Sequence, residues 1–335
     1  MNATIKDIAV HAGVSTATVS NVLTQKKYVS QELEERVYDA VQTLDYHPNV
    51  YARNLKTNCS HTIGMLVPDI TNPFFSEGVK NVQNIMSAKG YQLILYDSDN
   101  CLQTEVQNLK SVMDAQADGI ISIAPRTDIC EIAGRLDIPV VIMDRPMCTT
   151  DRNVAFVYAD NYCGAASVAD YLLSKGYTRF FCLAGPTGTV SNANTRVKGF
   201  WETLIAHGID RDACEVYYGD FTFDAGYKLM KEALHGYQPG TKPAAAFVSS
   251  DIMAWGAMEA AKDLKLKIPR DLGIVGYDNI YFSSFLYPKL TTVANPIKEM
   301  AVNAASLMLD ALENKRNLQG VSVVLRSSLI VRKSC

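Results

Sequence analysis

The sequence lacks the short motifs that mark the common enzyme families. It contains no GxSxG, no GxxxxGKS/T and no HExxH, and no GxGxxG follows a strand-like run. None of the five histidines lies in a segment that could line a ligand cleft. Asp144 and Asp278 could be imagined as an acid and a base, but a site that only binds its ligand uses such carboxylates too. These absences favour a binding protein over an enzyme.

Long apolar runs and paired cysteines are also missing. No apolar run approaches the length of a membrane span, and the first residues, MNATIKDIAV, show no signal-peptide pattern. The eight cysteines are scattered without a CxxC pair, which favours reduced thiols and disfavours a zinc site. We therefore expect a cytoplasmic protein with no membrane partner, no metal and no cofactor.

A strong excess of positive charge is absent as well. The formal net charge is −3, which is not typical of a protein that binds nucleic acid over its whole surface. Any DNA contact must therefore be local, because the charge near the contact surface sets the phosphate interaction.

Residues 4–23, TIKDIAVHAGVSTATVSNVL, have the pattern of two short helices joined by a glycine turn. The first helix is predicted by apolar residues at helical spacing: Ile5, Ile8, Ala9 and Ala12. Gly13 supplies the turn, and Ser15 is a natural N-cap for a second helix. Two such helices could be ordinary packing, but they are also the signature of a helix-turn-helix, whose second helix reads the major groove. The arc opposite the apolar stripe of that helix is small and polar: Thr16, Ala17, Ser20 and Asn21.

A third helix is predicted after Ser30, which we expect to cap it, and it closes a three-helix head over residues 1–47. Pro48 ends this helix, and residues 48–61 form a linker with one very short helix, VYARNLK. Two turns do not hold alone in water, so we expect this helix to fold only on DNA. Leu55 would then be a minor-groove wedge, with Ala52 close by and Lys56 at the groove wall. A plain linker is the alternative.

From residue 62 onward, β-rich apolar runs alternate with helical stretches in two series. This alternation predicts two α/β lobes with parallel sheets. We place the first lobe at 62–159 and 291–320, and the second at 160–290 and 321–335. One long helix is expected over 290–312, followed by two strand-like pieces that return to the lobes. Ligands bind beyond the carboxyl ends of such strands, so two facing lobes predict a cleft.

Several segments together resemble the LacI/GalR (lactose repressor/galactose repressor) family of bacterial transcription regulators. They are the helix-turn-helix, YVSQELEERVYDAVQTLDYHPNVYARNLKT, TIGMLVPDITNPFF, VVIMDRP, VGYDN, PKLTTV and LIVRKSC. The resemblance covers essentially the whole chain. It implies an α+β multi-domain protein, with the helix-turn-helix head followed by two α/β Rossmann-like lobes of periplasmic-binding-protein type. It also implies a homodimeric regulator, most often a repressor, which binds a pseudo-palindromic operator.

The same resemblance assigns roles in DNA binding. Thr16, Ala17 and Asn21 look like base readers, Ser15 and Tyr28 look like phosphate contacts, and Leu55 looks like the central wedge. Asn21 departs from the Arg often found there, and Asn pairs with adenine through two bonds.

For the cleft, the resemblance implies contacts from both lobes to a small effector: Asn72, Phe74, Phe75, Asp144, Arg145, Arg196, Phe221, Ser250 and Asp278. Aromatic rings cover the apolar side of a sugar, while carboxylates and guanidinium groups bond its hydroxyls. Asp144 next to Arg145 favours a sugar over a purine, and Ser250 stands where many sugar binders have Asn. A secreted sugar-binding protein is a further alternative, but the missing signal-peptide pattern and the attached head speak against it. Two alternatives stay open: a regulator controlled by a phosphocarrier-protein corepressor, and one with a purine-type effector. The sequence does not decide between dimer and tetramer.

Overall fold

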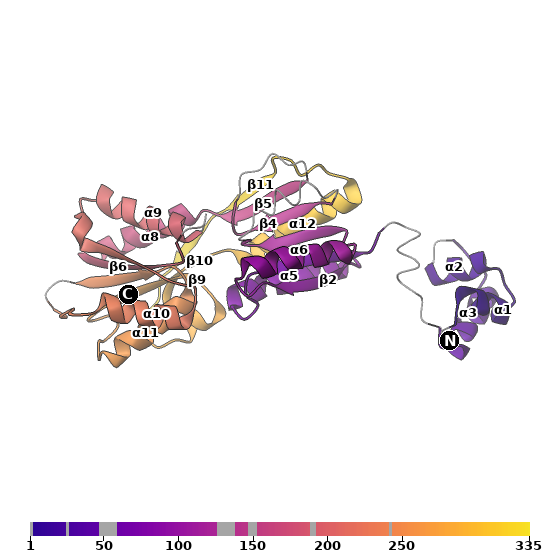
Figure 1. The fold of residues 1–335 in the computed structure, drawn as a ribbon, viewed down its shortest axis with the longest axis horizontal. Helices are drawn as coiled ribbons and strands as arrows, with labels where there is room; N and C mark the ends of the chain where they lie inside the picture. Colours follow the sequence, from indigo (N-terminus) through magenta and orange to yellow (C-terminus); the bar gives the residue numbers. More distant parts are fainter. Residues whose placement is uncertain are drawn as a thin grey trace. The chain divides into compact units, whose positions relative to one another are not determined.

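The structure is a computed structural model that describes residues 3–24, 27–46, 59–125, 138–146, 153–187, 192–240 and 243–335. Contacts along the chain divide it into two compact units, 1–60 and 61–335 (Figure 1). The second unit holds two lobes, each built on its own sheet. Within the described ranges, no helix is long and apolar enough to cross a bilayer.

The first unit is a head of helices α1 (Ile5–Ala12), α2 (Thr16–Thr24) and α3 (Gln31–Thr43). Thr4 begins α1 with a capping box, because its side chain accepts from the Asp7 amide while the Asp7 carboxylate accepts from the Thr4 amide. Gly13 ends α1 in the left-handed region at φ 64°, which only glycine adopts without strain. The predicted head is confirmed. Its core consists of small and branched apolar side chains: Ile8, Ala9, Ala12, Val19, Val22, Val37 and Ala40.

The ends of α2 and α3 differ in how they are capped. Ser15 caps α2 as predicted, since its Oγ accepts from the Thr18 amide at 3.0 Å. Ser30 occupies the N-cap position of α3 as predicted, but its side chain makes no capping hydrogen bond, so only the position was predicted correctly. Ser30 is exposed, and the acidic Glu32 and Glu34 in the first turn provide the negative charge that stabilises this helix end.

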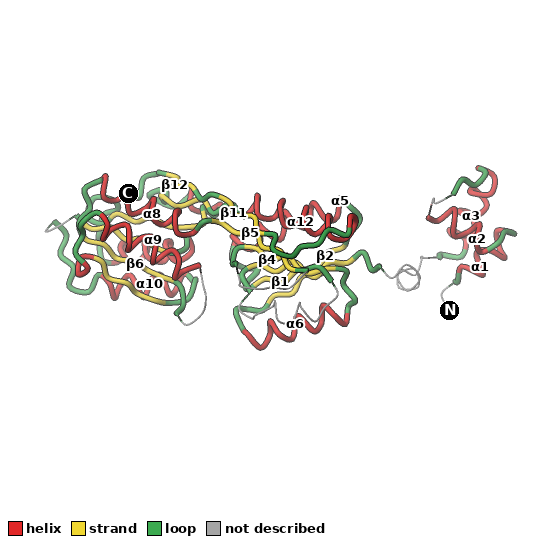
Figure 2. Tube along the Cα trace, turned by 90° about the horizontal axis from the view of Figure 1, so that it is seen from above, coloured by secondary structure: helices red, strands yellow, loops and turns green. Residues whose placement is uncertain are grey.

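The first lobe is a parallel sheet with the strand order β11–β5–β4–β3–β1–β2. Helices α5 and α12 pack on one face, where the larger apolar core lies, and α6 packs on the other (Figure 2). The helices are α5 (Pro73–Ala88), α6 (Leu102–Asp114) and α12 (Ile297–Asn314). The strands are β1 (Thr62–Val67), β2 (Gln92–Asp97), β3 (Gly119–Ile123), β4 (Val140–Met143), β5 (Val154–Ala159) and β11 (Ser322–Leu325).

The second lobe repeats this plan with the strand order β12–β10–β9–β8–β6–β7, in which β12 alone runs antiparallel among the described strands. Helices α8 and α9 cover one face, and α10 and α11 cover the other. The helices are α8 (Asn161–Ser174), α9 (Asn192–Ala206), α10 (Phe223–Ala233), α11 (Asp251–Asp263) and the 3-10 turns η1 (Arg211–Ala213) and η2 (Tyr281–Ser284). The strands are β6 (Arg179–Ala184), β7 (Cys214–Tyr218), β8 (Ala244–Val248), β9 (Gly273–Asp278), β10 (Thr291–Ala294) and β12 (Ser328–Ile330).

The chain passes between the lobes after β5, after β10 and after β11. Two details of the prediction were therefore wrong. Residues 291–294 are a strand of the second sheet and not the start of one long helix from 290. Their β-branched side chains favour a strand, and Pro296 marks the N-cap before α12. Residues 322–325 pair with β5 in the first sheet, although the sequence pattern assigns 321–335 wholly to the second lobe.

Candidate ligand cleft and DNA-reading face

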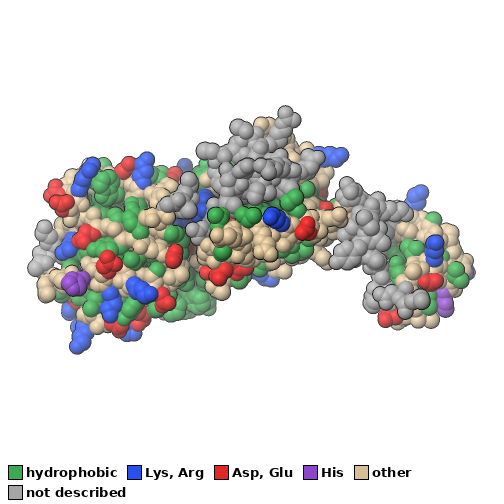
Figure 3. All heavy atoms as spheres, viewed as in Figure 1, with side chains coloured by type: hydrophobic (Ala, Val, Ile, Leu, Met, Phe, Trp, Pro, Cys, Tyr) green, Lys and Arg blue, Asp and Glu red, His purple; other side chains and the backbone are tan. Residues whose placement is uncertain are grey.

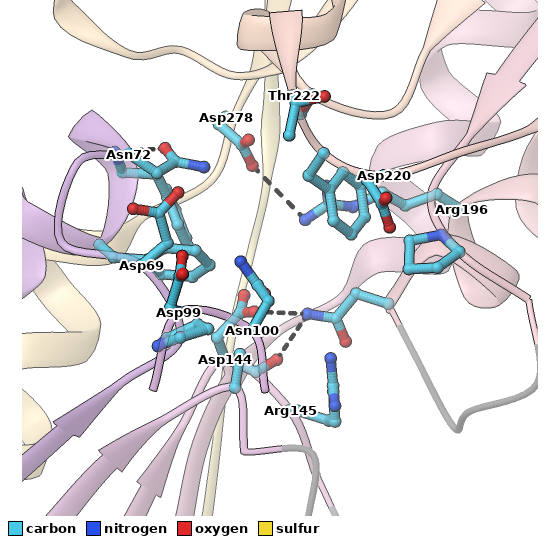
Figure 4. A pocket seen from close by; sticks show the side chains of 18 residues that line it. Asp69, Asn72, Asp99, Asn100, Asp144, Arg145, Arg196, Asp220, Thr222 and Asp278 are labelled. Carbon is cyan, nitrogen blue, oxygen red and sulfur yellow. Dashed lines mark hydrogen bonds and ion pairs between the residues drawn. The ribbon is translucent and has the colours of Figure 1, made fainter. Parts of the chain in front are cut away.

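A cavity of about 390 Å³ lies where the carboxyl ends of strands from both lobes meet (Figure 4). The structure brings all nine predicted cleft residues to this one cavity: Asn72, Phe74, Phe75, Asp144, Arg145, Arg196, Phe221, Ser250 and Asp278. Sequence reasoning missed the other lining residues: Pro68, Asp69, Asp99, Asn100, Ala124, Pro186, Asn192, Asp220 and Thr222. Most of these belong to loops whose return to the cavity depends on the tertiary fold.

The start of α5 supplies the aromatic wall of the first lobe. Asn72 caps this helix, with its Oδ1 accepting from the Phe74 amide at 3.0 Å, and Pro73 fits the first helical position. The cap leaves the Asn72 amide nitrogen directed toward the cavity (Figure 4). Phe74 is buried and meets Phe75 edge to face, with ring centroids 5.4 Å apart. The NPFF sequence thus fixes one polar and two aromatic groups at the same edge.

Asp144 links the two lobes directly. It follows β4 with φ 70°, a left-handed conformation that turns its buried side chain into the cleft. Asn192, the first residue of α9 in the second lobe, donates its Nδ2 to Asp144 Oδ2 at 2.7 Å and to the Asp144 carbonyl at 3.0 Å. Because α9 and β4 belong to different lobes, these bonds hold the two lobes together across the cleft.

Arg196 connects several segments of the second lobe at the bottom of the cleft. Its Nε donates to Asn161 Oδ1 at 2.8 Å, and its Nη1 donates to the Ser249 carbonyl at 2.6 Å. Its Nη2 lies 3.5 Å from Asp278 Oδ1, and the guanidinium carbon lies 3.7 Å from the centroid of the Tyr277 ring. The side chain is only 4% exposed, so most of its bonding capacity holds the second lobe together.

Asp278 is the most perturbed acid of the cleft. Burial raises its pKa to about 7; the Arg196 charge opposes this rise, the Asp144 charge adds to it, and the Asn295 bond opposes it. Asn295 lies between the two carboxylates, with its Nδ2 3.4 Å from Asp144 Oδ1 and 3.4 Å from Asp278 Oδ1. The two acids therefore form one electrostatic unit that spans both lobes, with Asp278 titrating near neutral pH.

Asp251 holds the loop that follows Asp278. It accepts from the Ile280 amide at 2.9 Å and from Thr292 Oγ1 at 2.6 Å, which anchors the loop after β9. Burial, followed by the charge of Asp278, raises its pKa well above the usual range for Asp. Asp251 is not among the cavity-lining residues. Its bond to Thr292 depends on the pairing of β10 with β9, which the sequence did not predict.

Two further predicted residues are positioned by small neighbours and helix ends. Phe221 packs so closely on Gly185 that a Cβ at that position would overlap the ring. Ser250 caps α11, where its Oγ accepts from the Met253 amide at 3.3 Å. Only glycine therefore lets Phe221 occupy this position, and the Ser250 hydroxyl stays at the cavity as a donor.

The DNA-reading candidates fall into two groups. Ser15, Thr16, Ala17 and Tyr28 are exposed, and Ser20 and Asn21 are half-buried on the same helix that holds Val19 and Val22 in the core. The visible face of residues 61–335 carries acidic and basic side chains interspersed, without one large basic area (Figure 3). The second group of candidates lies outside the described residues: Ala52, Leu55 and Lys56.

A helix-turn-helix head followed by a two-lobed domain with a polar cleft defines a class of protein: DNA-binding regulators with a ligand-binding domain. Residues 4–49 match the family described as bacterial regulatory proteins, lacI family, and residues 169–335 match the periplasmic binding protein-like domain. The chain belongs to the lacI family of bacterial regulatory proteins. It is 36% identical over 333 residues to the HTH-type transcriptional repressor CytR of Escherichia coli, which covers 99% of this chain and 96% of that protein.

The other relatives and solved structures agree with this assignment. The ribose operon repressor of Escherichia coli is 34% identical over 311 residues, or 92% of each chain. The lac repressor dimer bound to operator and the anti-inducer ONPF matches with a TM-score of 0.84 at 26% identity, over 100% of this chain and 99% of that one. A LacI family regulator from Enterococcus faecium with bound ribose matches with a TM-score of 0.71 at 27% identity, over 82% and 98%.

These matches confirm the predicted family and fold class. The chain is a DNA-binding transcriptional regulator with the helix-turn-helix head and the two periplasmic-binding-protein-like lobes that its sequence indicated. Its family consists of transcriptional regulators.

Proposed function

We propose that this protein represses transcription as a homodimer on a pseudo-palindromic operator, and that a sugar or sugar derivative in the cleft sets its affinity for that operator. One observation carries the effector part: two carboxylates, Asp144 and Asp278, share a cavity with Phe75 and Phe221. Carboxylates accept hydrogen bonds from hydroxyl groups, and aromatic faces cover the apolar side of a sugar ring. The relatives support this choice, since one is named for the ribose operon and one solved structure holds ribose.

The same residues support binding rather than catalysis. Asn192 and Asn295 bond the Asp144 carboxylate, and Arg196 and Asn295 surround Asp278 Oδ1. Such partners orient the two carboxylates, and we assign no reaction to them. Since the proposed target is chromosomal DNA, we place the action of the protein in the cytoplasm.

For DNA, we propose that Thr16, Ala17 and Asn21 contact base edges and that Ser15 and Tyr28 contact phosphates. Exposure of the first turn of α2 supports this assignment, because the N-terminal residues of a recognition helix are those that reach the bases. Asn21→Ala should weaken binding to the selected operator by about 10-fold to 100-fold and relax its preference at one base pair. Equal binding to all sequences by the unmodified protein would contradict the proposal.

Homodimer formation has candidate surfaces in both lobes. The edge strand β2 exposes Ile94 and Leu95, and the segment around η2 exposes Tyr281, Phe285 and Tyr287, the last of which is 99% exposed. Tyr281 and Phe285 lie together, with ring centroids 4.9 Å apart, and clustered exposed apolar side chains mark protein contact sites. We propose that both surfaces face the partner subunit. The second surface begins at Tyr281, three residues after Asp278.

Regulation follows from the contacts across the cleft. We propose that the ligand competes with or reinforces the bonds between Asn192 and Asp144, and so changes the angle between the lobes. That change would alter the spacing of the two heads in the dimer, and Leu55 would then seat in the minor groove or leave it. The coupling is reciprocal, so the operator must change ligand affinity by the same factor.

Operator selection followed by titration with candidate ligands tests the proposal. A pool of random duplexes yields the preferred sequence, and fluorescence anisotropy then measures operator affinity with sugars, nucleobases and a phosphocarrier protein. A sugar that changes the affinity in the unmodified protein, but not in Phe221→Ala, supports the proposal. Asp212→Asn, an exposed change outside the cavity lining, is the matched control. A response to a purine base alone, or to the phosphocarrier protein alone, would favour those alternatives instead.

A further inference from the structure

The three segments that connect the lobes all contact one buried group of side chains in the second lobe. This group consists of Arg196, Tyr277 and Asp278. Arg196 donates its Nε at 2.8 Å to Asn161, where the connection after β5 ends. The Tyr277 hydroxyl donates at 3.4 Å to Ser327 Oγ in the connection after β11, and Asp278 meets the connection after β10 through Asn295. A change of charge in this group therefore reaches every connection between the lobes.

Asn295 stands between two carboxylates that belong to different lobes. It follows β10 directly, on the segment that leads to α12, and it is only 4% exposed. Its Nδ2 lies 3.4 Å from Asp144 Oδ1 of the first lobe and 3.4 Å from Asp278 Oδ1 of the second. Its Oδ1 is buried and has no hydrogen-bond partner among the described residues. Asn295 thus offers both acids the same donor group and leaves its acceptor unused.

Titratable and charged groups surround Asp278 on every element packed against it. They are Asp144 and Arg145 after β4, Arg196 on α9, Tyr277 on β9, Asp251 on α11, Arg332 near the C-terminus, and Asp69, Asp99 and Asp220 at the mouth of the cavity. No histidine lies among the described residues of the cavity lining. Burial raises the pKa of Asp278 to about 7. Arg196 and the bond from Asn295 oppose the rise, whereas Asp144 adds to it. Asp278 therefore gains or loses its charge near neutral pH.

Two of these influences on Asp278 depend on the angle between the lobes. Opening the cleft would admit water to the side chain, which lines the cavity, and would move it away from Asp144 of the other lobe (Figure 4). Both changes lower the pKa of Asp278, because burial and a nearby negative charge each disfavour the charged form. The carboxyl group therefore binds a proton more tightly when the lobes are closed. By linkage, a bound proton favours closure.

We propose that Asp144, Asn295 and Asp278 form a proton-sensitive switch between the lobes, in which a proton on Asp278 favours the closed cleft and its loss favours the open one. In the charged state, the two carboxylates share Asn295 Nδ2 and repel each other across the cleft. In the protonated state, the Asp278 hydroxyl donates to Asn295 Oδ1, and Nδ2 remains for Asp144. The proton exchanges with solvent through the cavity. The switch needs no effector, and only its effect on the operator rests on the proposed function.

Distances between spin labels in the ligand-free full chain test the switch. Nitroxide-bearing non-natural residues are placed at two exposed positions, Lys198 on α9 of the second lobe and Glu313 on α12 of the first. Dilution with unlabelled chain leaves one labelled chain in each dimer. Double electron–electron resonance then gives the ratio of closed to open forms from pH 5 to pH 8.5. This ratio should rise about 10-fold as pH falls across the range, since one pKa unit of difference between two forms changes their ratio tenfold.

Three variants distinguish the switch from a purely structural role. Asp278→Asn cannot titrate at this position and should give the same ratio at every pH. Asp144→Asn removes the charge that adds to the rise in the Asp278 pKa, so it should move the transition to lower pH. Asn295→Ala removes the bond that opposes the rise, so it should move the transition to higher pH. Asp212→Asn, an exposed change outside the cavity lining, is the matched control and should keep the original profile.

The outcomes distinguish the inference from the proposed function. A ratio that stays constant from pH 5 to pH 8.5 in the unmodified protein would overturn the inference, and so would a pH dependence that persists in Asp278→Asn. Operator affinity is then compared between the unmodified protein and Asp278→Asn at each pH. A difference that follows the distance profile supports both the switch and the proposed function. If the lobes respond to pH and this difference does not, the switch stands and the proposed coupling of lobe angle to operator fails.

Discussion

Asp278→Asn should remove a loss of stability that the effector unit, residues 61–335, undergoes as pH rises. The Asp278 pKa is raised from 3.8 to about 7, mainly by burial. The folded state therefore binds more protons than the unfolded chain between about pH 4 and 7. The free energy of unfolding falls as pH rises through this window, and the full penalty is present above pH 7. Asparagine keeps the shape of the side chain without the charge.

The size of the effect follows from the shift. About three pKa units at about 1.4 kcal/mol each give an upper limit of roughly 4 kcal/mol. The Asp278 charge also raises the pKa of Asp251, so its removal relaxes Asp251 in the same direction. The attraction between the Asp278 charge and Arg196 is already contained in this net shift, since it lowers the pKa against the effect of burial. The difference between pH 5 and pH 8.5 therefore isolates the charge of Asp278.

Intrinsic fluorescence makes the assay specific. The two tryptophans of the sequence, Trp201 and Trp255, both lie in the effector unit, so their thermal transition reports on that unit. Relative to the unmodified protein, Asp278→Asn should gain several degrees in Tm between pH 5 and pH 8.5, since about 1 kcal/mol corresponds to about 2–4 °C at this size. Asp212→Asn is the control. Parallel Tm curves for Asp278→Asn and the unmodified protein across this range would refute the reasoning.

Three other variants test separate parts of the structure. Asn192→Ala removes both bonds to Asp144 and should widen the lobe angle, seen as a larger radius of gyration in solution scattering of the ligand-free protein. An unchanged scattering curve would show that other contacts set the angle. Gly185→Ala should displace Phe221 and weaken ligand binding in calorimetry by about 10-fold or more, with DNA binding retained in the absence of ligand. Normal ligand affinity would contradict the placement of that ring. Ile8→Ala opens a cavity in the head and should cost about 2–5 kcal/mol. Operator binding should then be lost while the tryptophan transition stays unchanged; loss of both would contradict the independence of the two units.

Local patterns in the sequence sufficed for most of the fold. The apolar runs predicted strands such as β5 and β7. The cleft residues in NPFF, MDRP and GYDN came from the family resemblance, and the structure brings them to one cavity. The strand predictions worked because a run of β-branched and apolar residues is encoded over a few neighbouring positions. The helix predicted from 290 failed because apolar spacing alone does not separate a short strand from the helix that follows it.

The parts that escaped prediction depend on contacts between distant segments. Asn192 reaches Asp144 across the cleft, and Asn295 sits between two carboxylates that are far apart in sequence. Asp251 bonds Thr292 only because β10 pairs beside β9. No periodicity or motif reports such juxtapositions. The prediction for Leu55 concerns residues outside the described ranges and stays a prediction.

The central claim is that occupancy of the cleft and occupancy of the operator are coupled. The most direct measurement is a thermodynamic cycle on the full chain: operator affinity with and without saturating ligand, and ligand affinity with and without saturating operator. The account predicts that both affinities change by the same factor, of about 5-fold to 150-fold, and that Phe221→Ala abolishes the change at ligand concentrations that saturate the unmodified protein. An operator affinity that is identical with the cleft filled and empty would contradict it.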